Sequence, residues 1–118
     1  MRLIMGLLPA SILAYGASWS GMLVDSRCYA SEMSDGNLYP VYADSDMNMR
    51  IRQCIPNART KAFAVVQDDW QGLNLDSAGN SKAAELVHQA ATESQLRVTA
   101  TGKRNKNTIK VDSIVAAR

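Results

Sequence analysis

The feature that most constrains this chain is one helical pattern set among short strand patterns. Between residues 77 and 90, apolar side chains recur at the spacing of a single helix face: Ala83, Leu86, Val87 and Ala90. Asn80 is the expected N-cap, because its side chain can accept a hydrogen bond from a free backbone amide. The sequence therefore predicts one short amphipathic helix whose opposite face is polar.

Strand patterns precede this helix. Residues 18–26 are rich in aromatic and branched side chains, with a bend or bulge expected at Gly21. Two further patterns follow at residues 61–67 and 70–76. Because only two aspartates separate these last two patterns, they predict a hairpin.

The segment after the helix gives the clearest hairpin. Apolar and polar residues alternate from Leu96 to Thr101, and a polar turn around Asn105 leads to a second strand through Ile109 and Val111. The order is thus strand, long loop, two strands, helix, two strands. It predicts a mainly β fold, a five-stranded OB-fold-like partly open barrel with one short helix between strands 3 and 4. The competing arrangement is an open antiparallel sheet with the helix across one face.

A signal peptide is expected over residues 1–16. One basic residue is followed by an apolar run and then by small residues that suit a signal peptidase, Ala14 at the −3 and Gly16 at the −1 position. The run is shorter than the roughly 20 residues that span a bilayer. We expect periplasmic or secreted localisation, no stable membrane insertion of the mature chain, and a single domain over residues 17–118.

Export bears on the two cysteines, Cys28 and Cys54. An oxidising compartment favours pairing them, and closing a loop of this length stabilises a fold by roughly 3.5 kcal/mol in the chain-entropy treatment. Reactive or metal-binding thiols are the alternative, but neither cysteine has a CxxC partner and the single histidine is distant in sequence. The sequence predicts a Cys28–Cys54 disulfide.

The stretch ADSDMNMRIRQC, residues 43–54, begins like a calcium-binding loop. Oxygen-bearing residues alternate there as in an EF-hand: Asp44, Asp46 and Asn48. However, Met49 replaces the glycine that makes the turn, and Ile55 replaces the glutamate that completes the ligand set. We expect an acidic loop tethered at Cys54 and no metal site. Copper(I) binding by methionines is an alternative, but gap-filling in the core suits these residues better.

Five segments of the chain match a known pattern: Trp19 to Asp25, Cys28, Phe63 to Val66, Leu75 to Leu86, and Val98 to Ile114. On these segments, which cover most of the mature chain, the sequence resembles small exported bacterial OB-fold-like domains of unknown function. The resemblance implies this architecture and export. It implies no activity, since none of these segments is a catalytic signature.

The sequence predicts no enzyme and no cofactor. His88 is the single histidine and lies beside the apolar stripe of the predicted helix, without a cysteine or an acidic ligand pattern near it. Asp68 and Asp69 fall in a turn, where aspartate favours local backbone hydrogen bonds.

Charge gives the one indication of binding. From residue 97 to residue 118 there are six basic residues against one acidic residue. An exported binding module for an anionic or carbohydrate ligand, a polyanion or an oligosaccharide, is therefore expected, with no cytoplasmic nucleic-acid role. Its candidate ligand-binding residues are Trp70, Arg97, Lys103, Arg104 and Lys106. Tyr42 is a second possible stacking residue. The alternatives are a charged hairpin that blunts a sheet edge, and a structural or protein-interaction domain without a small-molecule ligand.

Overall fold

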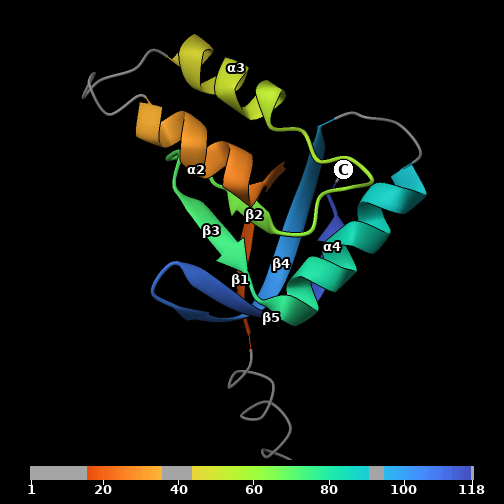
Figure 1. Ribbon diagram of the computed structural model, residues 1–118. Helices are drawn as coiled ribbons and strands as arrows, with labels where there is room; N and C mark the ends of the chain where they lie inside the picture. The colour runs from red at the N-terminus through yellow and green to blue at the C-terminus, as the bar shows by residue number, and fades with distance from the viewer. Residues whose placement is uncertain (1–15, 36–43, 91–94, 118) are drawn as a thin grey trace, which may run out of the picture.

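The computed structural model describes residues 16–35, 44–90 and 95–117. Its elements follow one another in the order β1 (Ala17–Asp25), α2 (Ser26–Asp35), α3 (Asp44–Gln53), β2 (Phe63–Val66), β3 (Gly72–Leu75), α4 (Ser77–Ala90), β4 (Leu96–Asn105) and β5 (Thr108–Ala116) (Figure 1). The expected signal peptide, apart from Gly16, and Tyr42 lie outside the described residues.

The five strands close into a barrel in the order β1-β2-β3-β5-β4. β1 pairs antiparallel with both β2 and β4, and the circle is completed by a short parallel pairing of β3 with β5. The predicted OB-fold-like class is confirmed, including the helix between the third and fourth strands. The barrel is closed, however, whereas the sequence predicted a partly open one.

Two glycines allow strands to pass closely. A Cβ on Gly21 would lie 2.1 Å from the carbonyl oxygen of Val66, so this position of β1 accommodates the end of β2. The register of β1 is regular at Gly21, and the irregularity in the barrel lies instead between Thr101 and Gly102. There the pairing with β5 steps over Asp112, and a Cβ on Gly102 would lie 2.0 Å from the carbonyl oxygen of Lys110.

The main core fills the barrel. Alternate residues of every strand point inward and are buried: Leu23, Phe63, Val65, Leu73, Leu75, Val98, Ala100, Ile109, Val111 and Ile114. α4 closes one side of this core with Ala83, while Leu86 and Val87 pack partly buried beside it. The apolar stripe predicted for this helix therefore faces the barrel.

α4 begins earlier than the sequence suggested. Its first residue is Ser77, and Asp76 acts as the cap, because its Oδ1 accepts a hydrogen bond from the backbone amide of Gly79 at 2.9 Å. The predicted cap, Asn80, lies inside the helix. Its Oδ1 accepts a hydrogen bond from the amide of Phe63 at 2.9 Å and so ties α4 to β2.

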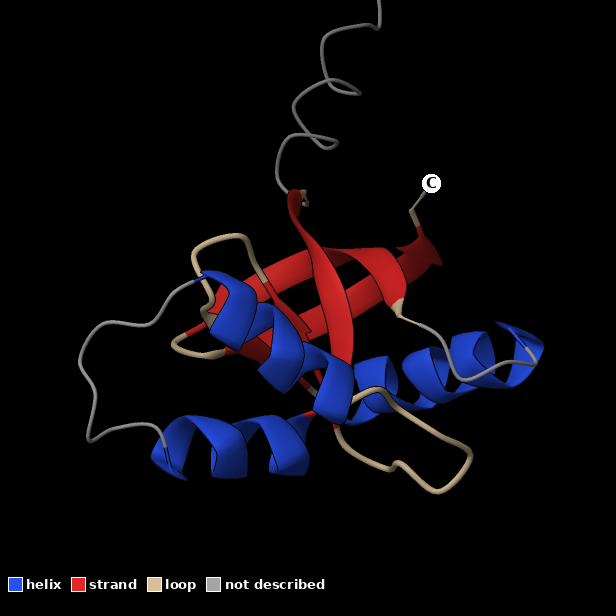
Figure 2. Ribbon diagram, turned by 90° about the horizontal axis from the view of Figure 1, so that it is seen from above, coloured by secondary structure: helices blue, strands red, loops and turns tan. Residues whose placement is uncertain are grey.

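A second core lies outside the barrel, under α2 and α3. These two helices lie side by side over one part of the barrel, away from α4 (Figures 1 and 2). They cover outward residues of β1 and β2, so that all four residues of β2 are buried. Tyr29 of α2 and Ile51 of α3 pack there against Val24 and Val66.

The prediction of a long loop between the first two strands is wrong, because residues 26–35 and 44–53 are helices. Residues 44–53 therefore do not form the acidic loop that the sequence predicted. Isolated helices of this length are marginal in water. Here Asp25 caps α2 by accepting hydrogen bonds from the amides of Arg27 and Cys28, and an ion pair of 3.5 Å joins Arg50 of α3 to Glu32 of α2.

The predicted disulfide is present. Cys28 of α2 and Cys54, just after α3, are bonded, and their Cα atoms lie 5.4 Å apart. Cys54 is almost fully buried, and its backbone oxygen accepts a hydrogen bond from the amide of Asp25 at 2.9 Å. The bridge thus fixes the far end of the helical segment to the end of β1.

Replacing both cysteines, Cys28→Ser with Cys54→Ser, should lower the free energy of unfolding by about 2–4 kcal/mol, because the unfolded chain regains loop entropy. Chemical denaturation measures the loss. Reduced wild-type protein should unfold at the same denaturant concentration as the double variant. An unchanged midpoint in both would contradict the stabilising role of the bridge.

Gly21→Ala should cost about 1–3 kcal/mol, since the added methyl group overlaps the backbone of β2. Gly72→Ala is the matched control, because its Cβ would approach a ring carbon of Tyr29 at 3.2 Å and meet no backbone. Thermal unfolding should show the larger loss at position 21. Equal losses would argue against the close strand crossing.

Candidate ligand-binding surfaces

The outer face of β2 and β3, which binds oligonucleotides and oligosaccharides in OB-folds, is largely occupied by the chain's own helices. Ala64 and Val66 point outward from β2 and are buried in the second core. A Cβ on Gly72 of β3 would contact Tyr29 of α2. A ligand therefore has to bind beside the helices or on the remaining strands.

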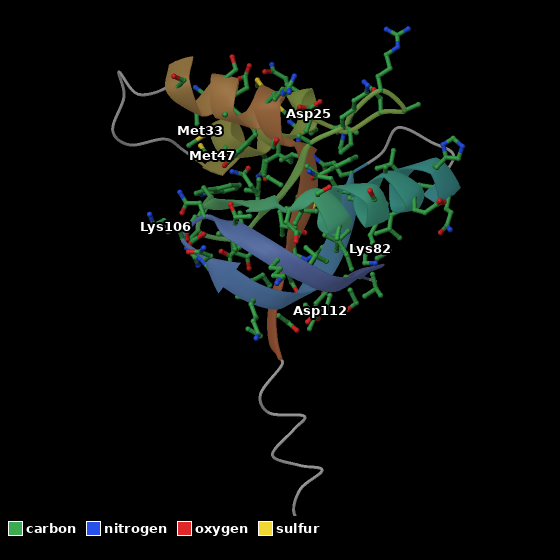
Figure 3. The ribbon with its side chains drawn as sticks, turned by 60° about the horizontal axis from the view of Figure 1, so that its bottom comes forward. Asp25, Met33, Met47, Lys82, Lys106 and Asp112 are labelled. Atoms are coloured by element: carbon green, nitrogen blue, oxygen red, sulfur yellow. A yellow bond between two sulfur atoms is a disulfide. The ribbon has the colours of Figure 1, made fainter. Side chains whose placement is uncertain are left out.

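The five candidate residues from the sequence fall into two groups. Trp70 and Arg97 line one pocket, next to α3. The other three lie on the β4–β5 hairpin: Lys103, Arg104 and Lys106. Figure 3 shows Lys106 at the end of this hairpin, well away from Lys82 on α4. The structure thus replaces the single predicted site with two neighbouring surfaces.

The first surface is the outer face of β1, β4 and β5. Most outward positions there carry hydroxyl or basic groups, whereas Met22, Val115 and Asp112 also lie on the outside. The hydroxyl and basic residues are Ser18, Ser20, Arg97, Thr99, Thr101, Lys103, Lys110 and Ser113. Hydroxyl pairs link β1 to β4, with Ser18 Oγ 3.0 Å from Thr101 Oγ1 and Ser20 Oγ 2.8 Å from Thr99 Oγ1. We call these eight residues the hydroxyl-basic face.

Sequence reasoning missed most of this face. The hydroxyl residues carry no charge, and their alternation with apolar residues was used only to predict strands. That alternation could have found them, because it puts every second residue of a strand on the same side. Lys110 was counted among the basic residues but was not selected as a site residue.

Two lysines lie directly opposite each other at one end of this face. Lys103 of β4 pairs with Lys110 of β5, and both side chains are exposed. Like charges in this position destabilise a sheet. Among the described residues, the ion pairs are Arg50 with Glu32 and Arg97 with Asp68, so neither lysine is neutralised by one of these.

The hairpin end beside these lysines forms an open cleft. The cleft measures about 550 Å³ and is lined by Asp76, Asn105, Lys106, Thr108 and Lys110. Lys106 begins the turn with a φ of 58°, a conformation that favours glycine or asparagine. The Nε of Arg104 donates a hydrogen bond to the backbone carbonyl oxygen of Lys106 at 2.6 Å. The turn therefore holds the guanidinium of Arg104 against the backbone of Lys106.

The second surface is a pocket of about 300 Å³ between α3 and the barrel, which we call the α3 pocket. Its lining is apolar on one part, from Met22, Ile51, Val66 and Trp70, and polar on the other, from Asn48, Gln67, Asp68, Gln95 and Arg97. The volume lies at the lower end of the range for small-molecule sites.

Trp70 enters this pocket from a strained turn. Its φ is 69°, which is unusual for a bulky residue. Its backbone amide donates to the carbonyl of Gln67 at 2.9 Å, and its own carbonyl accepts a hydrogen bond from the phenol of Tyr29 at 2.7 Å. In the same turn, Asp69 bonds the amide of Gln71, the local hydrogen bond expected of a turn aspartate.

Burial raises the pKa of the Tyr29 phenol from 10.0 to about 12; the positive charge of Arg50 lowers it in part, and the negative charge of Asp69 adds to the rise. The neutral phenol is the form that donates to Trp70. The turn that carries Trp70 is therefore supported by a hydrogen bond that persists until strongly alkaline pH.

Arg97 lies at the boundary of the two surfaces. Its guanidinium is 3.3 Å from Asp68, whose side chain is 89% exposed, so the pair is highly solvated and contributes little to stability. A ligand anion can replace Asp68 at small cost. Arg97 can thus serve a ligand on the hydroxyl-basic face and one in the α3 pocket.

His88 is exposed near the end of α4. The described residues contain no cluster of three or more histidine, cysteine, aspartate or glutamate side chains suited to a metal ion. Of the helices that are described, none is long and apolar enough to cross a membrane. No protein-family model, no curated protein and no solved structure matches this chain.

Tyr29→Phe should remove the tyrosine whose phenol has the raised pKa. Because the folded pKa lies above the unfolded value, the phenol contributes stability that is fully present below pH 10.0 and is lost as the pH rises through about 12. Tyrosinate absorbance should show one residue that titrates near pH 12 in the wild type and none there in the variant. A wild-type titration with every tyrosine near pH 10 would contradict this assignment.

Proposed function

We propose that this protein is an exported domain that binds a polyanion on the hydroxyl-basic face. The observation that carries the proposal is the cross-strand pair of Lys103 and Lys110, two exposed like charges held together on the outer side of the barrel. Such a pair costs folding energy unless an anion lies over it. The proposal takes up the anionic ligand that the basic C-terminal segment indicates.

The rest of the face supports the same ligand class. Arg97 lies further along β4, and Lys106 adds positive charge at the hairpin turn, whereas Arg104 pairs with the core residue Ile109 and so lies on the other side of β4. The serine and threonine hydroxyls between them can donate hydrogen bonds to phosphate, sulfate or carboxylate oxygens. The acidic residue of β5 is Asp112, which lies at the bulge, two positions from Lys110.

Export is supported by two independent features. One is the apolar segment with small residues at Ala14 and Gly16. The other is the disulfide, since such bridges persist mainly in oxidising compartments. An exported domain of this kind would meet anionic polymers of a cell surface or an extracellular matrix.

The alternative function of the lysines is protection of an edge. β1 pairs with β4 from Gly102 back towards Leu96, so residues 103–105 of β4 project beyond β1. Charged residues at such an edge prevent pairing with another chain. This alternative predicts no binding of anionic polymers beyond that of any other exposed lysine pair.

Lys103→Gln with Lys110→Gln should weaken binding to heparin, used as a model polyanion. Each lysine near an anionic surface contributes about 1 kcal/mol, so the dissociation constant should rise roughly thirtyfold at low salt. Salt-gradient elution from immobilised heparin measures the effect. The matched control is Lys61→Gln with Lys82→Gln, which removes the same charge from exposed positions elsewhere. Equal elution of both double variants would refute the proposal.

A further inference from the structure

We infer that the α3 pocket is a subsite for one sugar ring of an acidic glycan. The inference rests on the proposed polyanion face and names the class of polyanion that this face takes. It concerns Trp70 and the apolar and amide side chains around it, which are not needed for attraction of charge alone.

The lining of the pocket suits a sugar ring better than an inorganic anion. Met22, Ile51, Val66 and Trp70 form its apolar part. A pyranose ring has an apolar face of C–H groups that packs on such a surface, and hydroxyl groups at its edge. Amide side chains that can both donate and accept hydrogen bonds lie around it, from Asn48, Gln67 and Gln95. Phosphate or sulfate alone would leave the apolar part without a partner.

The backbone at Trp70 is a separate indication. A turn that needs a φ of 69° is served best by glycine or asparagine, so a tryptophan there is explained by what its ring contacts: it packs partly buried against the second core and lines the α3 pocket. Strain of this kind concentrates at binding sites, where the surrounding structure maintains it. Here the phenol of Tyr29 bonds the Trp70 carbonyl and holds the residue in place.

The pocket is continuous with the hydroxyl-basic face through Arg97. Along β4, outward positions proceed from Arg97 through Thr99 and Thr101 to Lys103. With about 3.4 Å per residue in an antiparallel strand, Arg97 and Lys103 are roughly 20 Å apart. A glycan of several units, with one ring in the pocket and its anionic groups on the basic residues, spans this length.

Three probes separate the contributions of ring and charge. Heparin hexasaccharide has both, polyphosphate has charge without a ring, and maltohexaose has rings without charge. Trp19→Phe leaves Trp70 as the one tryptophan of the chain. In this variant, heparin hexasaccharide should shift or quench the tryptophan fluorescence. Saturating polyphosphate should bind but leave the emission unchanged.

Trp70→Asn removes the ring but keeps a residue that tolerates the turn. It should raise the dissociation constant of heparin hexasaccharide about five- to tenfold, a loss typical of one aromatic contact. Polyphosphate binding should not change, which also shows that the variant is folded. Calorimetry measures both.

The possible results separate the two proposals. If Trp70→Asn binds both polyanions as the wild type does, or if polyphosphate shifts Trp70 emission equally, the sugar subsite is refuted while the polyanion face stands. If maltohexaose binds as tightly as heparin hexasaccharide, the subsite is not one for acidic glycans. If the wild type binds neither polyanion, the proposed function fails, and the subsite fails with it.

Discussion

The backbone pairing of β1 with strands on both of its sides holds this fold together. Met22 and Leu23 pair at once with β2 and with β4, and without this double pairing the barrel would be an open sheet. The residues of β1 on either side of this pair have different structural roles. Gly21 lets β2 approach, Val24 points outward under the helices, and Asp25 caps α2. Five consecutive residues therefore close the barrel and attach the helical layer to it.

The strands and α4 could be predicted because their burial is periodic. Leu96 to Thr101 alternate between the core and the outer face, and the stripe of α4 faces the barrel. α2 and α3 could not, because much of their stability comes from contacts between residues far apart in sequence. The disulfide joins residues 26 positions apart, and Tyr29 packs against Val66 of β2, whereas the Asp25 cap on the amide of Cys28 is a local contact. Likewise, Asp76 rather than Asn80 caps α4, since it also accepts a hydrogen bond from the amide of Val111 on β5.

The candidate site was predictable in residue type but not in arrangement. Trp70 and Arg97 were selected for stacking and for charge, and closure of the barrel brings them to one pocket. The same closure separates them from Lys106 at the hairpin. The sequence could not predict Asn48 and Ile51 as site residues, because they line the pocket only if α3 is a helix packed on the barrel.

The seam between β3 and β5 has a consequence for motion. These strands pair over two residues each, Asn74 with Thr108 and Leu75 with Ile109, whereas β4 and β5 pair along most of their length. Opening at this seam leaves both hairpins and the pairing of β1 intact. We therefore expect amide hydrogens at the seam, such as that of Asn74, to exchange with solvent through local opening, and that of Leu23 to exchange through global unfolding. The closed barrel would then open locally where β3 meets β5.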